Sequence, residues 1–91
     1  MMRGMEDDWC VYAVRDGSEI LYIGASSNLP KRTKLHRYTS ATWWKDGLTV
    51  KAMSWHRHDS AAFAAERLAI IEHQPVHNIQ WNPRYAKKVA Q

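Results

Sequence analysis

The N-terminal third of the chain contains two short apolar segments separated by a turn signal. Residues 9–14 are rich in β-prone side chains, and residues 20–23 form a second apolar run. Between them lies Arg15-Asp16-Gly17-Ser18, whose Asp-Gly pair suits the unusual backbone angles of a hairpin turn. The pattern predicts an antiparallel hairpin whose second strand ends at Gly24. Glycine there permits tight backbone geometry or the close approach of another group.

A helix and a third strand are predicted after the hairpin. Candidate N-cap residues at 26–28, followed by Pro30, favour a helix over residues 29–38. Residues 43–47 have the composition of a loop, and this segment begins with two tryptophans that we expect in the core or lining a groove. Apolar and polar residues alternate over 49–55, which predicts a strand.

A second helix is predicted near the C-terminus. Asp59 is expected to cap an Ala-rich helix over residues 60–74, which Pro75 ends. Residues 76–81 are expected to add a short extended piece. The element order is therefore β-β-α-β-α, which predicts an α+β fold with a three-stranded antiparallel sheet flanked by helices.

The length of 91 residues allows a single domain, with an expected core over residues 9–82 and frayed ends at 1–8 and 85–91. Hydrophobic residues make up 45% and charged residues 24% of the chain, which argues against disorder. The sequence has no run near the roughly 20 apolar residues of a membrane span and no secretory signal. Cys10, the single cysteine, cannot form an internal disulfide, so a cytoplasmic location is expected.

The positive charge is concentrated in the predicted first helix. The chain has a net charge of +4. Its densest basic cluster consists of Lys31, Arg32, Lys34 and Arg37, with His36 among them. This distribution favours a polyanionic partner, although a solvated basic helix face explains the same spacing.

Glu66 interrupts the apolar surface of the predicted second helix. Its helical neighbours are all apolar, namely Ala62, Phe63, Ala69 and Ile70. An unpaired buried carboxylate is costly, so Glu66 either reaches solvent at the edge of the stripe or pairs with a distant arginine. The other interpretation is a metal ligand or a catalytic carboxylate.

Other polar and aromatic residues also have two interpretations. Arg32 and His36 share one helix face, where they could bind a phosphate and handle a proton. Tyr12 and Tyr22 lie in the predicted strands, where packing is the ordinary role and proton transfer the alternative. The ordinary role of Asn78 is a local hydrogen bond to the backbone.

The chain order of these residues resembles the GIY-YIG nuclease superfamily. Val11-Tyr12 is followed by Tyr22-Ile23-Gly24, as in the paired motif that names the family. The further matching positions are Arg32, His36, Glu66 and Asn78. The similarity spans residues 10–80, and its clear departure is Cys10, which stands where the first motif has glycine.

The resemblance implies a DNA endonuclease that depends on Mg²⁺, for which Mn²⁺ can substitute, and that leaves 5′-phosphate and 3′-hydroxyl ends. Glu66 would hold the metal, and Arg32 would neutralise charge on the phosphate. Either Tyr12 takes the proton from the attacking water, which requires a lowered pKa, or His36 takes it while Tyr12 orients the water.

The resemblance also implies supporting roles. Tyr22 would position Arg32 or the water, and Asn78 would tie the C-terminal segment to the site. Gly24 would serve the backbone turn into the first helix. The residues expected to bind the substrate are Lys31, Lys34, Arg37 and Gly24.

DNA is thus the expected partner, with nicking as the outcome for one site. A targeting partner or a homodimer would supply specificity. The main alternative is a basic nucleic-acid-binding module of the same fold that does not cut. A basic structural or protein-interaction domain is a further alternative.

Overall fold

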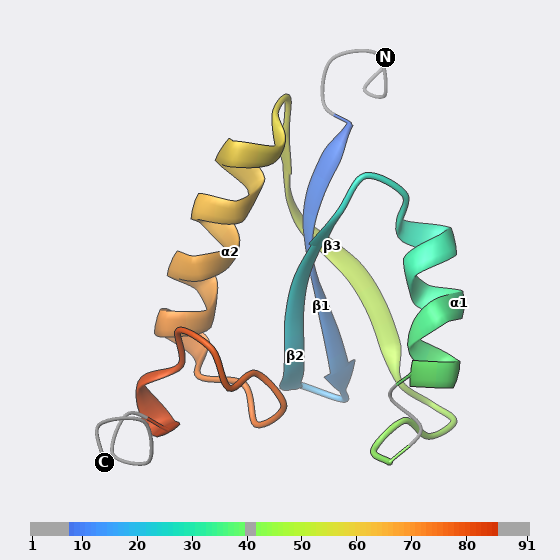
Figure 1. Ribbon diagram of the computed structural model, residues 1–91. Helices are drawn as coiled ribbons and strands as arrows, with labels where there is room; N and C mark the ends of the chain where they lie inside the picture. The colour runs from blue at the N-terminus through green and yellow to red at the C-terminus, as the bar shows by residue number, and fades with distance from the viewer. Residues whose placement is uncertain (1–7, 40–41, 86–91) are drawn as a thin grey trace.

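The computed structural model describes residues 8–39 and 42–85, which form one sheet and its flanking helices (Figure 1). The elements are β1 (Trp9–Asp16), β2 (Glu19–Ser26), α1 (Leu29–Thr39), β3 (Thr49–His56), α2 (Asp59–His73) and a short 3₁₀ helix, η1 (Pro83–Tyr85). The strands are antiparallel in the order β2-β1-β3. The predicted fold class and element order are therefore confirmed.

The hairpin turn lies where the sequence predicts it, but its second strand is longer. Gly17 adopts a φ of 61°, which glycine tolerates, and Asp16 pairs with Glu19 beside the turn. The prediction that β2 ends at Gly24 is wrong, because the strand continues to Ser26, which pairs with Cys10. Gly24 is an ordinary ladder position opposite Tyr12 and does not have the positive φ of a turn glycine.

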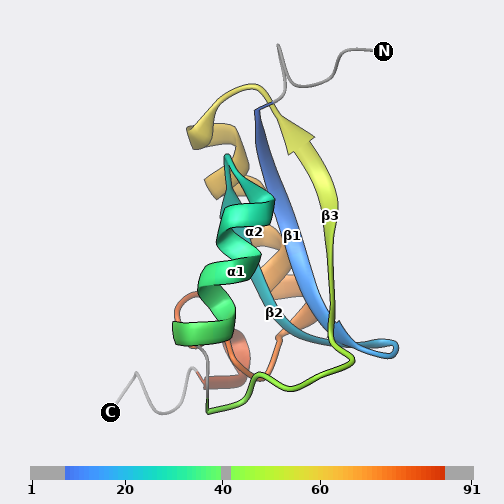
Figure 2. The same cartoon turned by 90° about the vertical axis from the view of Figure 1, so that its right-hand side faces the viewer.

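The central strand β1 supplies the core on both faces of the sheet. Val11 and Ala13 pack with Ile23 and with Ile70 of α2. On the other face, the alternate residues Cys10, Tyr12 and Val14 pack with Leu29 of α1 and with the loop before β3. The two helices therefore cover opposite faces of the twisted sheet (Figures 1 and 2).

The helix ends differ in detail from the sequence prediction. Asn28 caps α1, because its side-chain oxygen accepts a hydrogen bond from the Lys31 N–H at 3.1 Å. Asp59 is the first residue of α2 rather than its cap, and extended His58 occupies the N-cap position without a side-chain bond. A carboxylate in the first turn is favourable beside the helix N-terminus, which explains the acidic residue there. The helix ends at His73, because Gln74 adopts a left-handed φ of 49° before Pro75.

The segment after α2 forms turns rather than the predicted extended piece over 76–81. Tyr85, predicted to fray, lies in η1 and donates its hydroxyl hydrogen to the Val76 carbonyl. The other residues predicted to fray, 1–7 and 86–91, lie outside the described residues. Within the part of the chain that the structure describes, no helix is long and apolar enough to cross a membrane.

Candidate functional site

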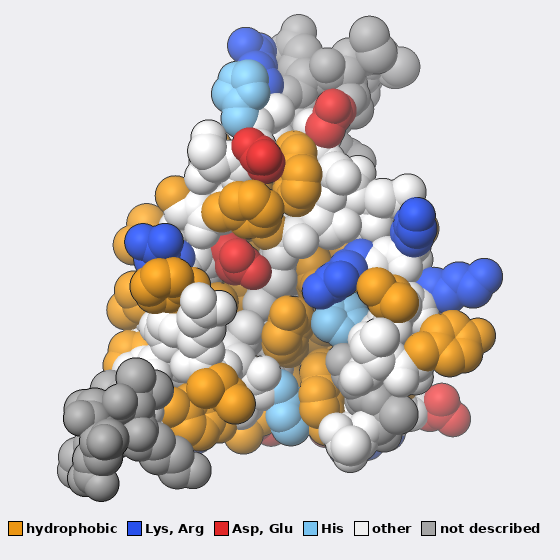
Figure 3. Space-filling model, in the orientation of Figure 1, with side chains coloured by type: hydrophobic (Ala, Val, Ile, Leu, Met, Phe, Trp, Pro, Cys, Tyr) orange, Lys and Arg blue, Asp and Glu red, His pale blue; other side chains and the backbone are white. Residues whose placement is uncertain are grey.

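Residues from five segments gather along the outer side of β2, the edge strand that lies between α1 and α2 (Figure 1). Tyr22 belongs to β2, Arg32 and His36 to α1, Glu66 to α2, and Asn78 to the segment after α2. Side chains of both charges and histidines are visible on this face (Figure 3). Tyr12, from β1, lies behind them as a neighbour of both Tyr22 and His36.

The deeper layer of the site is a hydrogen-bonded group centred on the Tyr12 hydroxyl. Tyr12 is 0% exposed and His36 is 4% exposed. Tyr12 Oη lies 2.7 Å from His36 Nε2, and Arg32 Nε donates to the same oxygen at 3.3 Å. Because an arginine can only donate, the phenol oxygen accepts from Arg32 and its hydrogen can bond to the imidazole.

Burial sets the protonation of this group. It raises the pKa of Tyr12 to about 12, because the phenolate is poorly solvated there. Burial also lowers the pKa of His36 from 6.5, and the Arg32 charge lowers it further. At neutral pH, Tyr12 is therefore a protonated donor and His36 a neutral acceptor. The fold does not supply the lowered pKa that a tyrosine base requires.

The outer layer of the site lines an open hollow, and Tyr22, Glu66 and His77 are half-buried there. A hollow of about 220 Å³ is lined by Tyr22, Glu66, Ile70, His77, Asn78, Ile79, Gln80 and Trp81. Desolvation raises the pKa of Glu66, and the positive charge of Arg32 opposes that shift. The hydrogen bond to Tyr12 is the chief cause that raises the pKa of Arg32. The positive charge of Arg32 therefore acts on the Glu66 carboxyl group across the site.

Gly24 makes room for the Tyr12 ring. A Cβ atom at this position would lie 2.5 Å from Tyr12 Oη and 2.6 Å from Cζ, which is closer than atoms can pack. Close approach is therefore the correct interpretation of this glycine. The expected role in a turn before α1 is wrong, because Gly24 lies inside β2. It is also buried, which does not suit the expected role in substrate binding.

Asn78 joins the C-terminal segment to the edge strand. Its side-chain oxygen accepts from the Ile23 N–H at 2.8 Å, and its amide nitrogen donates to the Ile23 carbonyl at 2.9 Å. The adjacent His77 N–H donates to the Leu21 carbonyl at 2.9 Å. The side chain does not make the local backbone bond that is its ordinary role, since its partner Ile23 is 55 residues away. The expected role of tying the C-terminal segment to the site fits this geometry.

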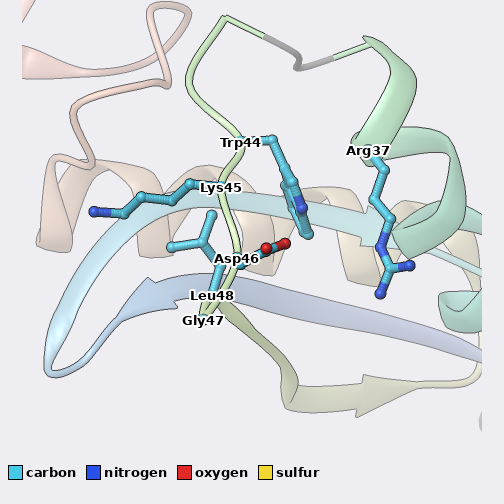
Figure 4. Close-up of a pocket in the computed structure, with 6 residues that line it drawn as sticks. All are labelled: Arg37, Trp44, Lys45, Asp46, Gly47 and Leu48. Carbon is cyan, nitrogen blue, oxygen red and sulfur yellow. The ribbon is translucent and has the colours of Figure 1, made fainter.

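The basic residues of α1 are not all near the hollow that contains Glu66. Lys31 and Lys34 are exposed. Arg37 lines a different hollow, of about 360 Å³, with the loop over residues 44–48 (Figure 4). Lys45 of that loop points away from Arg37 (Figure 4) and forms an ion pair with Asp16 at 2.8 Å.

One contact beside the site joins two segments in a way that no sequence pattern indicated. The Trp43 and His77 rings stack with centroids 4.3 Å apart and planes 10° apart, which joins the loop before β3 to the segment after α2. Trp43 also contacts Tyr22, and Trp44 stacks on His36. The tryptophans thus line the site as expected. His77 joins the two segments through its ring, and this role is visible only in the tertiary structure.

The donor set fits a divalent cation that binds oxygen. Among residues 8–39 and 42–85, no three His, Cys, Asp or Glu side chains form a metal-binding cluster. Mg²⁺ commonly binds through one or two carboxylates and completes its shell with water and phosphate oxygens. Glu66 offers such a carboxylate on an open hollow, whereas both polar atoms of the Asn78 side chain are already bonded to the backbone.

Comparisons of the chain with protein-family models, curated proteins and solved structures found no match. The site is therefore interpreted from its own geometry and from the sequence resemblance.

Proposed function

We propose that this chain is a metal-dependent DNA endonuclease of the GIY-YIG type. The observation that supports the proposal best is the hydroxyl of Tyr12, which holds Arg32 and His36 together. Glu66 faces the adjoining hollow from the opposite helix. A cation, a neutral imidazole and a carboxylate on neighbouring elements are groups that phosphodiester hydrolysis can use.

Arg32 is the residue that we assign to the phosphate. Its Nε–H bonds to Tyr12, and a further hydrogen bond joins the guanidinium to Tyr22. These bonds orient the guanidinium plane, and its remaining N–H groups could bind phosphate oxygens. Charge that grows on the non-bridging oxygens would be neutralised there. Tyr22 lies beside this group and would position the guanidinium or the attacking water.

We assign the role of general base, which accepts the proton of the attacking water, to His36 rather than to a Tyr12 phenolate. Tyr12 is protonated at neutral pH, and its hydrogen bond ends on the His36 ring nitrogen. Water would attack the phosphorus and give its proton to Tyr12 Oη, while the phenol hydrogen moves to His36 Nε2. The bond from phosphorus to the 3′ oxygen breaks, and that oxygen takes a proton from solvent, which leaves 5′-phosphate and 3′-hydroxyl ends. Because the His36 pKa is lowered, cleavage is expected to decline only at pH below 6.5.

Glu66 is the residue that would hold Mg²⁺, or Mn²⁺ in its place. The chemistry that the metal supplies when bound is polarisation of the scissile phosphate and stabilisation of the leaving oxygen. The raised pKa of Glu66 predicts weaker metal binding in acid, because protons compete for the carboxylate.

Supercoiled plasmid provides the direct test, with Mg²⁺, with Mn²⁺ and with EDTA. The wild type is expected to nick the plasmid, while EDTA or Glu66→Ala abolishes nicking and DNA binding persists. Glu72→Ala is the matched control, because it removes an exposed carboxylate from the same helix. Nicking that survives Glu66→Ala would refute the assignment.

A module that binds DNA without cutting is the alternative, and the exposed Lys31 and Lys34 favour it equally well. DNA retention that weakens with salt, with no cleavage in any metal, would support this alternative. A half-buried carboxylate beside a phosphate site favours the enzyme, because it would repel DNA in the absence of a cation.

The expected setting is the cytoplasm, where the buried thiol of Cys10 stays reduced. One small domain buries little DNA surface, so we expect a targeting partner or a second copy to supply sequence specificity.

A further inference from the structure

The turn after Asn78 holds a tryptophan in a backbone conformation that suits glycine. The Asn82 N–H donates to the Ile79 carbonyl at 3.4 Å, which closes a four-residue turn with Trp81 in its third position. Trp81 has a φ of 67°. A positive φ in that position is typical of type II turns, where glycine or asparagine is the ordinary residue. A bulky side chain there marks a strained position.

The strained turn places Trp81 beside the candidate site. The residue is 47% exposed and lines the same hollow as Tyr22 and Glu66. The guanidinium carbon of Arg67 lies 4.0 Å from the centroid of its ring, as in a cation–π pair. An indole with an associated positive charge therefore lies in the same hollow as Glu66, the residue assigned to the metal.

The turn is rigidly attached to the rest of the site. The Asn82 side chain donates to the carbonyls of Pro75 and Asn78 at 2.7 and 2.8 Å. Asn78 is itself bonded to the edge strand. The backbone of the turn that carries the indole is thus held to β2 by buried hydrogen bonds, and this preorganisation favours binding.

We propose that Trp81 is a stacking platform for an unpaired base next to the phosphate that is cut. This inference rests on the proposed endonuclease function and names its substrate class, which is DNA with an unpaired base at a gap, flap or single strand. Within a continuous duplex, base faces are covered by their neighbours. An unpaired base has a face available for an aromatic side chain, whatever its sequence. Arg67 adds a positive charge for the adjoining backbone.

The test compares two DNAs of equal length in EDTA at fixed salt. One is a fully paired duplex, and the other has a single-nucleotide gap that leaves one base unpaired. The wild type is expected to bind the gapped DNA about 5- to 150-fold more tightly, the range that stacking of one base supplies. Trp81→Gly is expected to bring the ratio close to one without loss of folding, because glycine suits the positive φ.

Two further variants serve as controls. Trp81→Phe retains an aromatic ring and is expected to keep part of the preference. Tyr38→Ala removes an exposed aromatic side chain from α1, outside the hollow, and is expected to keep all of it. The inference would be overturned if Trp81→Gly still preferred the gapped DNA, or if Tyr38→Ala lost that preference to the same extent.

The outcomes also separate this inference from the proposed function. The wild type could bind both DNAs in a salt-sensitive way without preferring the gapped one. That result would refute the role of Trp81 and would not contradict the endonuclease proposal. Binding of neither DNA at low salt, with no plasmid nicking, would refute both.

Discussion

At the scale of the residue, the environment of Tyr12 determines the chemistry of the site. Its hydroxyl is shared by Arg32 and His36, and its ring occupies the space that Gly24 leaves open. The same burial that fixes these contacts keeps the phenol protonated. The tyrosine is therefore a hydrogen-bonding centre, and His36 is the better proton acceptor.

Substituting Gly24 by alanine tests this packing. The added Cβ would collide with the Tyr12 ring, so we expect Gly24→Ala to lower the free energy of unfolding by about 1–3 kcal/mol, measured by urea denaturation. In a Tyr12→Leu background, where the ring is gone, the same substitution is expected to cost less. An equal cost in both backgrounds would contradict the contact.

The raised pKa of Tyr12 predicts a loss of stability in alkali. The unfolded phenol loses its proton near pH 10 and the folded one near pH 12, so this stabilisation is complete below pH 10 and is lost as the pH rises towards 12. The loss is expected to reach about 2–3 kcal/mol. Chemical denaturation between pH 8 and 11.5 would show a shallower decline in Tyr12→Phe. Identical slopes would exclude a shifted pKa.

At the scale of the element, the segment after α2 replaces a missing neighbour of the edge strand. The Asn78 side chain pairs with both backbone groups of Ile23, as another strand would, and His77 adds a bond to Leu21. An edge strand that is covered in this way is protected from pairing with other chains. The same bonds bring the segment that contains Trp81 to the site.

Substitution of Asn78 would release this segment. Asn78→Ala leaves two buried backbone groups of Ile23 without partners, and we expect a loss of about 1–3 kcal/mol in unfolding free energy. Asn78→Asp keeps the acceptor but sets a carboxylate against a carbonyl, so it is expected to destabilise as well. Faster amide exchange at His77 would accompany both changes. The exposed Gln80→Ala is the control, and a comparable loss there would argue against a specific role for Asn78.

At the scale of the whole molecule, charge is distributed unevenly around the sheet. The exposed Lys31 and Lys34 lie on α1, the helix that also carries Arg32 and His36. With a net charge of +4, the protein is expected to attract polyanions, and the basic residues of α1 are expected to concentrate that attraction near the candidate site.

Salt dependence measures the contribution of this helix to DNA binding. Each phosphate contact that is removed is expected to reduce the slope of log K against log salt by about 0.9, so Lys31→Gln with Lys34→Gln is expected to reduce it by up to about 1.8. Lys51→Gln, on β3, is the matched control and should leave the slope unchanged. If Lys51→Gln reduced the slope as much as the double substitution on α1, the basic residues of α1 would not be the specific contact for DNA.

The order of elements and most of their limits could be predicted from the sequence alone. The Asp-Gly turn, the Asn28 cap and the left-handed end of α2 before Pro75 depend on interactions between residues close in the chain. Local steric and hydrogen-bonding preferences act over that range, so the pattern of residues specifies them. The choice of Tyr12, Arg32, His36 and Glu66 as candidates also came from the sequence.

The contacts and the protonation of these residues depend on the tertiary structure. The continuation of β2 past Gly24, the pairing of Asn78 with Ile23 and the stacking of Trp43 on His77 join segments that are distant in the chain. The pKa values of Tyr12 and His36 depend on burial, which no local pattern reports. Side-chain solvation and long-range contacts are properties of the packed molecule, and for that reason the chemistry of the site had to be read from the fold.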